Sequence, residues 1–275
     1  MTSSVKVLVL AGNGINCEME TAHACRLAGA DQVDITYLWD LATGKASLSG
    51  YHLLCLPGGF LDGDDLGSAR ASAIRFRHTQ VGENLLFDQF RDFKKSGGLA
   101  IGICNGFQLM AKLGLLPNLD NQRDEQDNIQ QMTLTWNDSG RFEDRWVDLC
   151  IDAESPCVFT IGLERISLPV RHGEGKLVAS DEIQHRVLEN HQVPLFYIDP
   201  QTGEKTTRYP LNPNGSREGM ASLTDSSGRF FGLMPHPEAF LHRTNHPHWT
   251  RRELPEEGDG LALFVNAVDF IRKSY

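Results

Sequence analysis

The chain of 275 residues lacks the marks of a membrane or secreted protein. No apolar run approaches the ~20 residues that a helix needs to cross a bilayer. The first residues run straight into a predicted strand and have neither the charged nor the long apolar region of a signal peptide. No low-complexity tract interrupts a composition that is 40% hydrophobic and 23% charged. We therefore expect a soluble protein of the cytoplasm.

Cationic residues are in short supply, with 26 Lys and Arg against 36 Asp and Glu, which gives a formal net charge of −10. This charge argues against binding to nucleic acid or to an anionic membrane. No Gly-x-x-x-x-Gly-Lys-Ser/Thr phosphate loop is present, so we expect any ATP-dependent step to need a separate chain. The six cysteines are scattered and none forms a C-x-x-C pair, which favours reduced thiols over disulfides or a cysteine zinc site.

Strand and helix patterns alternate over the first third of the chain. Apolar runs predict strands, and apolar residues with a helical period predict helices. The predicted strands are residues 5–10, 33–38, 52–56 and 99–103, and the predicted helices are residues 18–28 and 83–95. Such alternation implies parallel pairing through right-handed crossovers. The sequence therefore predicts an α/β fold with a doubly wound, largely parallel sheet flanked by helices.

Shorter strands follow in the second half of the chain. They are expected at residues 132–136, 145–151, 166–170, 195–198 and 230–234, before a final helix at residues 260–272. We expect these strands to be antiparallel additions that complete one side of the sheet. The acidic, Gln-rich residues 120–131 are predicted to form an exposed loop. No linker or internal repeat divides the chain, so residues 1–275 are expected to form a single domain.

The most informative segment surrounds Cys104. It follows the predicted strand at residues 99–103 and precedes a helix-like run that begins at Phe107. Strand, Gly-x-Cys-x-Gly, helix is the pattern of a nucleophile elbow, in which the flanking glycines permit a strained turn that exposes the central side chain. A helix N-terminus also favours the thiolate, the reactive form of cysteine. A buried structural cysteine in a glycine-flanked turn is the alternative interpretation.

Residues 234–238, Met-Pro-His-Pro-Glu, offer a base for this thiol. The two prolines exclude a regular helix. His236 and Glu238 are two residues apart, so on an extended backbone their side chains leave the same face. The carboxylate would then orient the imidazole while the other ring nitrogen faces the thiol. A surface turn with an incidental histidine and glutamate is the alternative.

A third element, Pro57-Gly58-Gly59-Phe60, follows the predicted strand at residues 52–56. In a parallel sheet, sites gather beyond the carboxyl ends of the strands, where Cys104 also lies. Consecutive glycines let backbone N–H groups turn toward a ligand. With the N–H of Asn105, they would form an oxyanion hole for a tetrahedral intermediate. An ordinary glycine-rich turn would contain the same residues.

Together these motifs resemble the class I (triad) glutamine amidotransferases. The chain carries Gly-x-Cys-x-Gly-x-Gln, an upstream Pro-Gly-Gly and a downstream His-Pro-Glu in the order of that family. Further segments resemble the glutaminase components of phosphoribosylformylglycinamidine synthase, an enzyme of purine biosynthesis. They are residues 14–18, 57–60, 63–64, 104–108, 113–117, 137–143, 145–147, 172–175, 209–210, 212–216 and 234–238. The resemblance runs from about Lys6 to the final helix.

The resemblance implies the flavodoxin-like fold of this family and hydrolysis of L-glutamine to glutamate and ammonia. Cys104 would be the nucleophile that forms a thioester, His236 the general base and acid, and Glu238 the group that orients His236. Gly59 and Asn105 would offer the oxyanion N–H groups. The residues expected to hold glutamine are Gly58, Phe60, Gln108 and His172.

A synthetase partner is also implied, with or without a small bridging subunit. Ammonia would pass to this partner and attack the ATP-activated amide of formylglycinamide ribonucleotide. ATP and Mg are expected in the partner, and no cofactor or metal is expected in this chain. Residues 141–145 and 172–175 have two interpretations: solvated loops with a salt-bridging arginine, or neighbours of the glutamine pocket or of the partner.

Two places depart from the usual pattern of the family. Leu61-Asp62 stands where Ser-Tyr is usual, a change that would alter access of glutamine. Ala239 stands where arginine is common, a change that would remove a salt bridge or a partner contact. Neither change falls on Cys104, His236 or Glu238, so the hydrolytic chemistry is expected to be kept.

The sequence leaves three other functions open: a free-standing cysteine hydrolase of the same fold, such as a deglycase or γ-glutamyl hydrolase, an amidotransferase subunit serving another synthetase, and a non-catalytic binding protein. Residues 104–108 and 139–142 argue against the hydrolase, and the intact Cys104, His236 and Glu238 argue against the binding protein. Three further histidines match no metal-ligand spacing, and we expect an exposed polar loop there. They are His242, His246 and His248.

Overall fold

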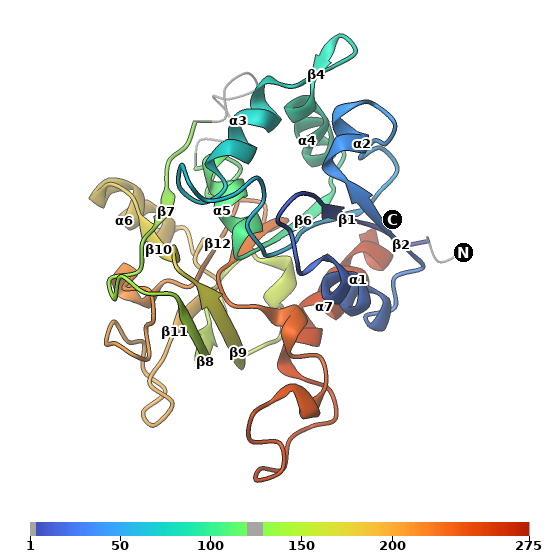
Figure 1. Ribbon diagram of the computed structural model, residues 1–275. Helices are drawn as coiled ribbons and strands as arrows, with labels where there is room; N and C mark the ends of the chain where they lie inside the picture. Colours follow the sequence, from blue (N-terminus) through green and yellow to red (C-terminus); the bar gives the residue numbers. More distant parts are fainter. Residues whose placement is uncertain (1–3, 120–128, 275) are drawn as a thin grey trace.

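A six-stranded sheet forms the centre of the computed structural model, which describes residues 4–119 and 129–274 (Figure 1). The strand order is β12-β13-β6-β3-β1-β2. Five of these strands are parallel, and the edge strand β12 runs antiparallel to β13. Their bounds are β1 Lys6–Ala11, β2 Gln32–Tyr37, β3 Leu53–Leu56, β6 Leu99–Ile103, β12 Ser222–Thr224 and β13 Phe230–Leu233. The predicted fold class, α/β with a largely parallel sheet, is confirmed.

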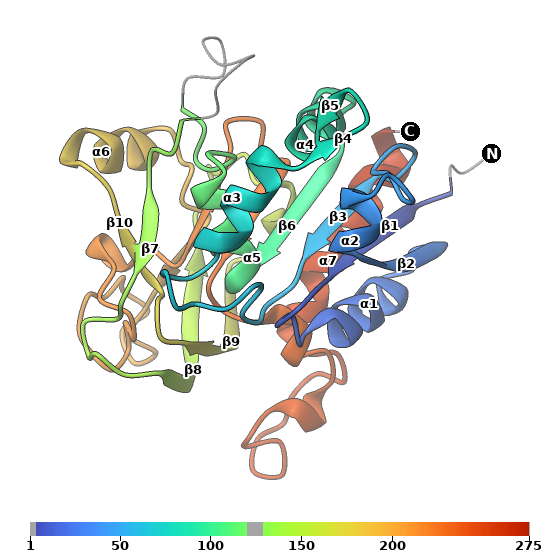
Figure 2. The same ribbon diagram turned by 45° about the horizontal axis from the view of Figure 1, so that its top comes forward.

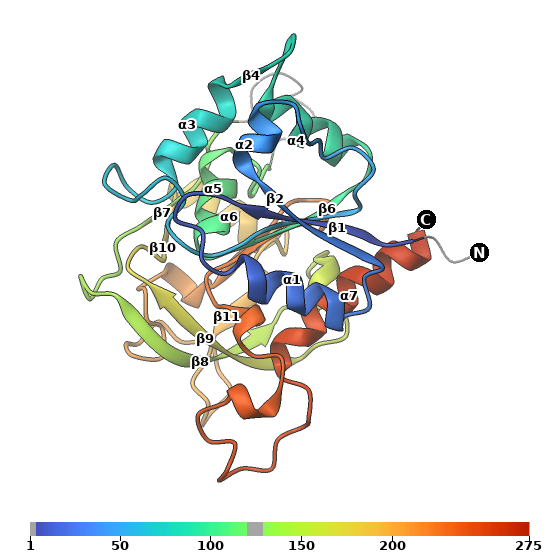
Figure 3. The same ribbon diagram turned by 45° about the vertical axis from the view of Figure 1, so that its right-hand side comes forward.

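Helices cover both faces of this sheet (Figure 3). Helices α1 (Glu18–Leu27) and α7 (Asp259–Ser274) lie on one face, and α3 (Arg70–His78), α4 (Leu86–Lys95) and α5 (Asn105–Lys112) lie on the other. The inner strands β3, β6 and β13 are buried at every position because helices exclude water from both sides. Their near-continuous apolar runs follow from this double covering.

A second sheet flanks the first and corrects one prediction (Figure 2). Strands β8 (Glu143–Ile151), β9 (Arg165–His172) and β11 (Leu195–Tyr197) pair antiparallel in the order β11-β8-β9. We expected these strands to extend the central sheet, but only β12 adds an antiparallel strand there, and β13 pairs parallel with β6. Strand β8 mixes buried and exposed positions, as suits a sheet with one open face.

Several short elements were not predicted. They are α2 (Leu38–Ala42), α3, α6 (Asp181–Glu189), the hairpin of β4 (Gln80–Val81) and β5 (Asn84–Leu85), β10 (Lys176–Val178), which pairs with β7 (Thr133–Thr135), and β12, with the 3₁₀ turns η1 (Val158–Thr160), η2 (Arg217–Gly219), η3 (Pro237–Ala239) and η4 (Arg243–Asn245). The hairpin takes the start of the helix predicted at residues 83–95, so α4 begins at Leu86. Most of the exposed loop predicted at residues 120–131 lies outside the described residues. The single-domain organisation stays a prediction.

No helix within residues 4–119 or 129–274 has the length and apolar character needed to cross a bilayer.

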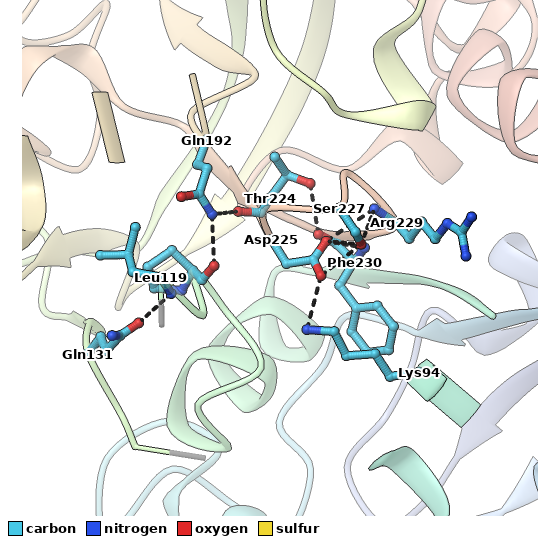
Figure 4. A network of polar contacts seen from close by, with 10 residues as sticks. Lys94, Leu119, Gln131, Gln192, Thr224, Asp225, Ser227, Arg229 and Phe230 are labelled. Atoms are coloured by element: carbon cyan, nitrogen blue, oxygen red, sulfur yellow. Dashed lines mark hydrogen bonds and ion pairs between the residues drawn. The ribbon is translucent and has the colours of Figure 1, made fainter. Parts of the chain in front are cut away.

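A buried polar network holds the turn between β12 and β13 (Figure 4). Asp225 is fully buried and accepts hydrogen bonds from the hydroxyl of Ser227 and from the backbone N–H groups of Arg229 and Phe230. Lys94 of α4 lies 3.0 Å from the same carboxylate and balances its charge. The network fixes the edge of the sheet beside β13.

The carboxyl ends of three neighbouring strands meet at one edge of the sheet. Strand β3 leads into Gly58 and Gly59, β6 leads into Cys104, and β13 leads into His236. Strands β3 and β13 pair on either side of β6, so these three segments are adjacent. The fold therefore brings together the three motifs that the sequence predicted to form a site.

Candidate active site

Cys104 occupies the strained turn between β6 and α5. Its backbone has φ 50° and ψ −103°, and its N–H donates to Leu233 O at 2.8 Å. A positive φ is costly for a residue with a side chain and is found where the surroundings impose it. A Cβ on Gly106 would lie 1.9 Å from Leu56 O, so glycine there lets α5 pack directly on β3. The predicted elbow geometry is present.

His236 and Glu238 form a buried pair on the 3₁₀ turn η3. The Nδ1 atom of His236 lies 2.5 Å from Oε1 of Glu238, and both side chains are almost fully buried. The backbone N–H of His236 donates to Pro169 O at 2.8 Å, which ties the segment to β9. The prolines allow only a short turn, as expected. The contact between imidazole and carboxylate predicted from the two-residue spacing is confirmed.

Burial lowers the pKa of His236, but the Glu238 charge and the interactions with the Cys104 and Cys17 thiols outweigh it, and the net pKa is raised well above 6.5. The Nε2 atom has no hydrogen-bond partner among the described residues. The Cys104 thiol interacts with the ring of His236, and its Sγ also contacts Arg171 O at 3.5 Å. The structure thus brings the three predicted triad residues together.

Two backbone amides face the space beside Cys104. Within the described ranges, neither Gly59 N–H nor Asn105 N–H donates a hydrogen bond. Gly59 has φ 141°, and a Cβ there would lie 2.5 Å from Gly14 O, so only glycine fits this close crossing of two loops. The N–H of Phe60 already donates to Gly14 O at 2.7 Å. The assignment of Gly59 and Asn105 as oxyanion donors stays a prediction.

A cavity of about 280 Å³ adjoins the thiol. Its lining consists of Gly59, Phe60, Asp64, Cys104, Gln108, Trp136, Phe142, Arg171, His172, Gly173 and Glu174. Three of the residues predicted to hold glutamine lie in this wall. Gly58, the fourth, does not: it packs against the ring of His236, where a Cβ would come within 2.7 Å of Cε1. The absence of a side chain at Gly58 makes room for the imidazole, and a role of Gly58 in holding glutamine stays a prediction.

The amide of Gln108 is engaged within the protein. Its Nε2 donates to Glu174 O at 2.6 Å, and its Oε1 accepts from Nδ2 of Asn105 at 3.0 Å. The carboxylate of Glu174 in turn accepts from the hydroxyl of Ser68 at 2.9 Å. Gln108 therefore fixes the shape of the cavity wall and the loop at Glu174.

His172 is buried in the same wall. Burial, with the nearby His236 charge, lowers the pKa of His172 to about 3, so the ring is neutral near pH 7. Its Nδ1 lies 3.0 Å from Oδ1 of Asn137, which also accepts from the N–H of Gly175. An amide oxygen only accepts, so Nδ1 carries the proton and Nε2 is an acceptor. That Nε2 has no hydrogen-bond partner in the described parts of the chain.

The departures from the family pattern lie away from the cavity wall. Leu61 is buried and its N–H donates to Oδ1 of Asn105, while Asp62 pairs with Arg75 at 3.1 Å. Of residues 141–145, Phe142 lines the cavity and Arg145 pairs with Glu143. The salt-bridging arginine is therefore present, although Glu143 and Arg145 lie in β8 and not in a loop, and a role beside glutamine stays a prediction.

Two of the three clustered histidines, His242 and His246, make separate structural contacts. His242 accepts from the N–H of Thr244 at the start of η4, and His246 packs against Trp146 with ring centroids 4.6 Å apart. They are not among the residues that the described structure groups as potential metal ligands.

Sequence reasoning gave no role to Cys17, Asn137 or Glu174. All three fall in segments that carried the family resemblance, and this was the available signal. Their contacts are made with residues far away in the chain, which spacing alone does not reveal.

The sequence of this chain is similar to those of known glutamine amidotransferases. Residues 4–271 match a family model described as the CobB/CobQ-like glutamine amidotransferase domain. The phosphoribosylformylglycinamidine synthase subunit PurQ of Dehalococcoides mccartyi is 42% identical over 98% of this chain and 99% of its own length. The chain belongs to the PurQ family. The PurQ subunit of Methanococcus maripaludis is 40% identical over 98% of both chains.

A longer relative and a solved structure also match the chain. The chain matches 20% of the length of phosphoribosylformylglycinamidine synthase from Schizosaccharomyces pombe, at 33% identity over 98% of this chain. A chain in the structure of PurLQS from Thermotoga maritima superposes with a TM-score of 0.69 at 26% identity, covering 98% of this chain and 99% of that one. The protein is thus a glutamine amidotransferase subunit, as predicted.

Proposed function

We propose that this chain is the glutaminase subunit of phosphoribosylformylglycinamidine synthase in purine biosynthesis. It hydrolyses L-glutamine and delivers ammonia to an ATP-dependent synthetase acting on formylglycinamide ribonucleotide. The observation that carries the proposal is the buried group of Cys104, His236 and Glu238 beside a cavity that opens to the surface, in a protein of the PurQ family. ATP and Mg belong to the partner, and the reaction is placed in the cytoplasm.

The chemistry begins at the thiol of Cys104. Its sulfur attacks the side-chain carboxamide carbon of glutamine, and its proton passes to Nε2 of His236. The oxygen that becomes negative accepts hydrogen bonds from the N–H groups of Gly59 and Asn105. Glu238 holds Nδ1–H of His236, fixing the ring and stabilising the imidazolium.

The intermediate then collapses to a thioester. The carbon–nitrogen bond breaks, the imidazolium of His236 gives its proton to the leaving nitrogen, and ammonia departs. Water next attacks the thioester carbon while His236 takes a proton from it. The carbon–sulfur bond breaks, glutamate leaves and the thiol of Cys104 is restored.

Glutamine is held by groups of the cavity wall. Nε2 of His172 accepts a hydrogen bond from an N–H of the substrate, because the neutral ring offers an acceptor and no charge there. The ring of Phe60 covers the substrate, while Gln108 keeps the loop at Glu174 in place.

The synthetase partner covers the mouth of this cavity. Phe60, Trp136 and Phe142 are 46%, 64% and 54% exposed, although large apolar side chains gathered around one opening favour burial against another protein. The PurLQS structure, in which the related chain is found, supports an assembly of this kind. A small bridging subunit is part of the proposal.

The test is synthesis by the purified complex of this chain with its synthetase. Formation of the amidine product is measured with ATP and either glutamine or ammonium as nitrogen source. Cys104→Ala is expected to abolish the glutamine-dependent rate and leave the ammonium-dependent rate unchanged. Cys150→Ser, a change on β8 outside the cavity, serves as the control and should retain both rates. Glutamine-dependent synthesis by the Cys104→Ala complex would overturn the proposal.

A further inference from the structure

A second cysteine lies behind the pair of His236 and Glu238. Cys17 precedes the first turn of α1, and the sequence of hydrolytic steps does not use it. Its Sγ, a ring nitrogen of His236 and a carboxylate oxygen of Glu238 all lie within 4.8 Å of one another. The three residues are 9%, 2% and 3% exposed. Sulfur, imidazole nitrogen and carboxylate oxygen are thus concentrated in one buried place.

Two polar atoms of this cluster are unsatisfied. Nε2 of His236 and Oε2 of Glu238 are buried and have no hydrogen-bond partner within residues 4–119 and 129–274. Buried polar atoms without partners are rare, and each one calls for a physical explanation. The Nε2 atom is explained by proton transfer with Cys104. Oε2 of Glu238 has no corresponding use in the hydrolysis.

The backbone of Gly58 brings the thiol and the ring together. A Cβ on residue 58 would lie 3.4 Å from Sγ of Cys17 and 2.7 Å from Cε1 of His236. The loop therefore packs directly on both groups, and it holds them in place without a side chain of its own. Glycine at this position therefore allows the close packing of the loop, the thiol and the ring.

A separate cavity leads to this cluster. It has a volume of about 350 Å³, and Cys17 and Glu238 lie in its wall together with the exposed Glu20 and His23 of α1. Arg171 is the one residue that its lining shares with the glutamine cavity. A small cation therefore reaches Cys17 and Glu238 without passing through the space for glutamine, and the Glu20 carboxylate attracts it.

We propose that Cys17, His236 and Glu238 bind Zn²⁺ and that the bound ion inhibits glutamine hydrolysis. One thiolate, one imidazole and one carboxylate with a water in the fourth position form a donor set that zinc accepts in proteins. Binding displaces the thiol proton of Cys17 and the proton between His236 and Glu238, both of which pass to solvent. The ion then occupies the groups that the reaction needs to move protons.

The proposed inhibition by Zn²⁺ rests on the proposed function, whereas the proposed binding of Zn²⁺ does not.

The cluster of Cys17, His236 and Glu238 is buried. The other grouping of potential ligands in the described structure is partly exposed, and it consists of Asp152, Glu154 and His191. Burial matters because a surface group of carboxylates is well solvated without an ion.

Binding is tested on the isolated chain with Co²⁺, which reports thiolate coordination by a charge-transfer absorption in the near ultraviolet. We expect one equivalent of Co²⁺ to produce the band and Zn²⁺ to abolish it by displacement. Cys17→Ser should lose the band, while Cys104→Ala and the control Cys150→Ser should keep it. A band that survives in Cys17→Ser and disappears in Cys104→Ala would place the metal on the nucleophile and overturn the proposal, as would no band at all.

A second measurement does not depend on how the variants fold. In the wild-type chain, Zn²⁺ should protect Cys17 from alkylation, detected by peptide mass spectrometry, and should leave Cys150 unprotected. Equal alkylation of Cys17 with and without Zn²⁺ would refute the site.

Inhibition is measured in the complex with the synthetase. Zn²⁺ at ten times its dissociation constant should lower the glutamine-dependent rate about tenfold by mass action, leaving the ammonium-dependent rate unchanged. A chelator should restore the rate. Binding without this inhibition would refute the regulatory part alone, and an inactive complex without metal would count against the proposed function.

Discussion

His236 holds its proton more tightly than a free imidazole because Glu238 faces it in a place without water. The reaction needs the neutral imidazole of His236 to accept the thiol proton of Cys104 before the imidazolium protonates the leaving ammonia, so the raised pKa of His236 moves the acid limb of the pH profile to higher pH. The same contact affects folding. Its contribution to stability is fully present below the pKa of unfolded histidine, 6.5, and is lost as the pH rises through the higher folded pKa.

Glu238→Gln removes the charge that raises the pKa of His236. We expect the acid limb of the pH profile of kcat/KM for glutamine to move to lower pH, and the maximal rate to fall by about 10²-fold or more. The profile is recorded with the synthetase complex. Glu238→Asp, which keeps the charge, should move the limb less. An unchanged limb in Glu238→Gln would show that the carboxylate does not control the protonation of His236.

Single residues were predictable where a local pattern forced their role. Cys104 was found from its flanking glycines, and His236 with Glu238 from their two-residue spacing. The packing of Gly58 against His236 was not predictable, because a Gly-Gly pair does not reveal which glycine lines the cavity. Cys17 was missed since its contact with His236 joins residues more than two hundred positions apart.

At the scale of elements, the packing of α5 against β3 positions the thiol. The helix approaches the sheet so closely that a Cβ on Gly106 would lie 1.9 Å from Leu56 O, an atom of the backbone. Because backbone cannot rotate aside as a side chain can, any larger residue must push the helix away. The elbow is therefore a property of two packed elements and of the turn between them.

Gly106→Ala is expected to destabilise the protein by about 3 kcal/mol and to lower activity by displacing Cys104. Gly67→Ala is the matched control: Gly67 has φ +94° with no atom within 4 Å of its Cβ position, so only backbone strain of about 1 kcal/mol is expected there. Denaturant unfolding measures both. Equal losses of stability in the two variants would contradict the packing argument.

The elements of the first third were predictable because strands covered on both faces show continuous apolar runs. The strands of the second half were recognised individually but assigned to the wrong sheet, since a half-buried strand carries no signal for its partner. Strand β9 illustrates this, as its pairing with β8 and the contact of Pro169 with His236 are both long-range. Helix α3 was missed because its arginines, Arg70, Arg75 and Arg77, obscure a narrow apolar face.

At the scale of the molecule, membership of the PurQ family and the arrangement of the site lead to one function. Glutamine enters a cavity whose rim is apolar and exposed, and the chemistry takes place among buried groups beneath it. The net charge of −10 argues against a general affinity of the chain for nucleic acid. The sequence resemblance predicted this function, and the structure adds which groups surround the thiol.

The most direct test of the account is covalent labelling of Cys104 by a chloroketone analogue of glutamine. The complex with the synthetase is treated with the analogue, and the adduct is located by peptide mass spectrometry, with Cys104→Ala as the control. We predict one adduct at Cys104 that excess glutamine prevents and that the control lacks. An adduct at another cysteine, or none with synthetase, its substrate and ATP all present, would contradict the assignment of Cys104 as the nucleophile.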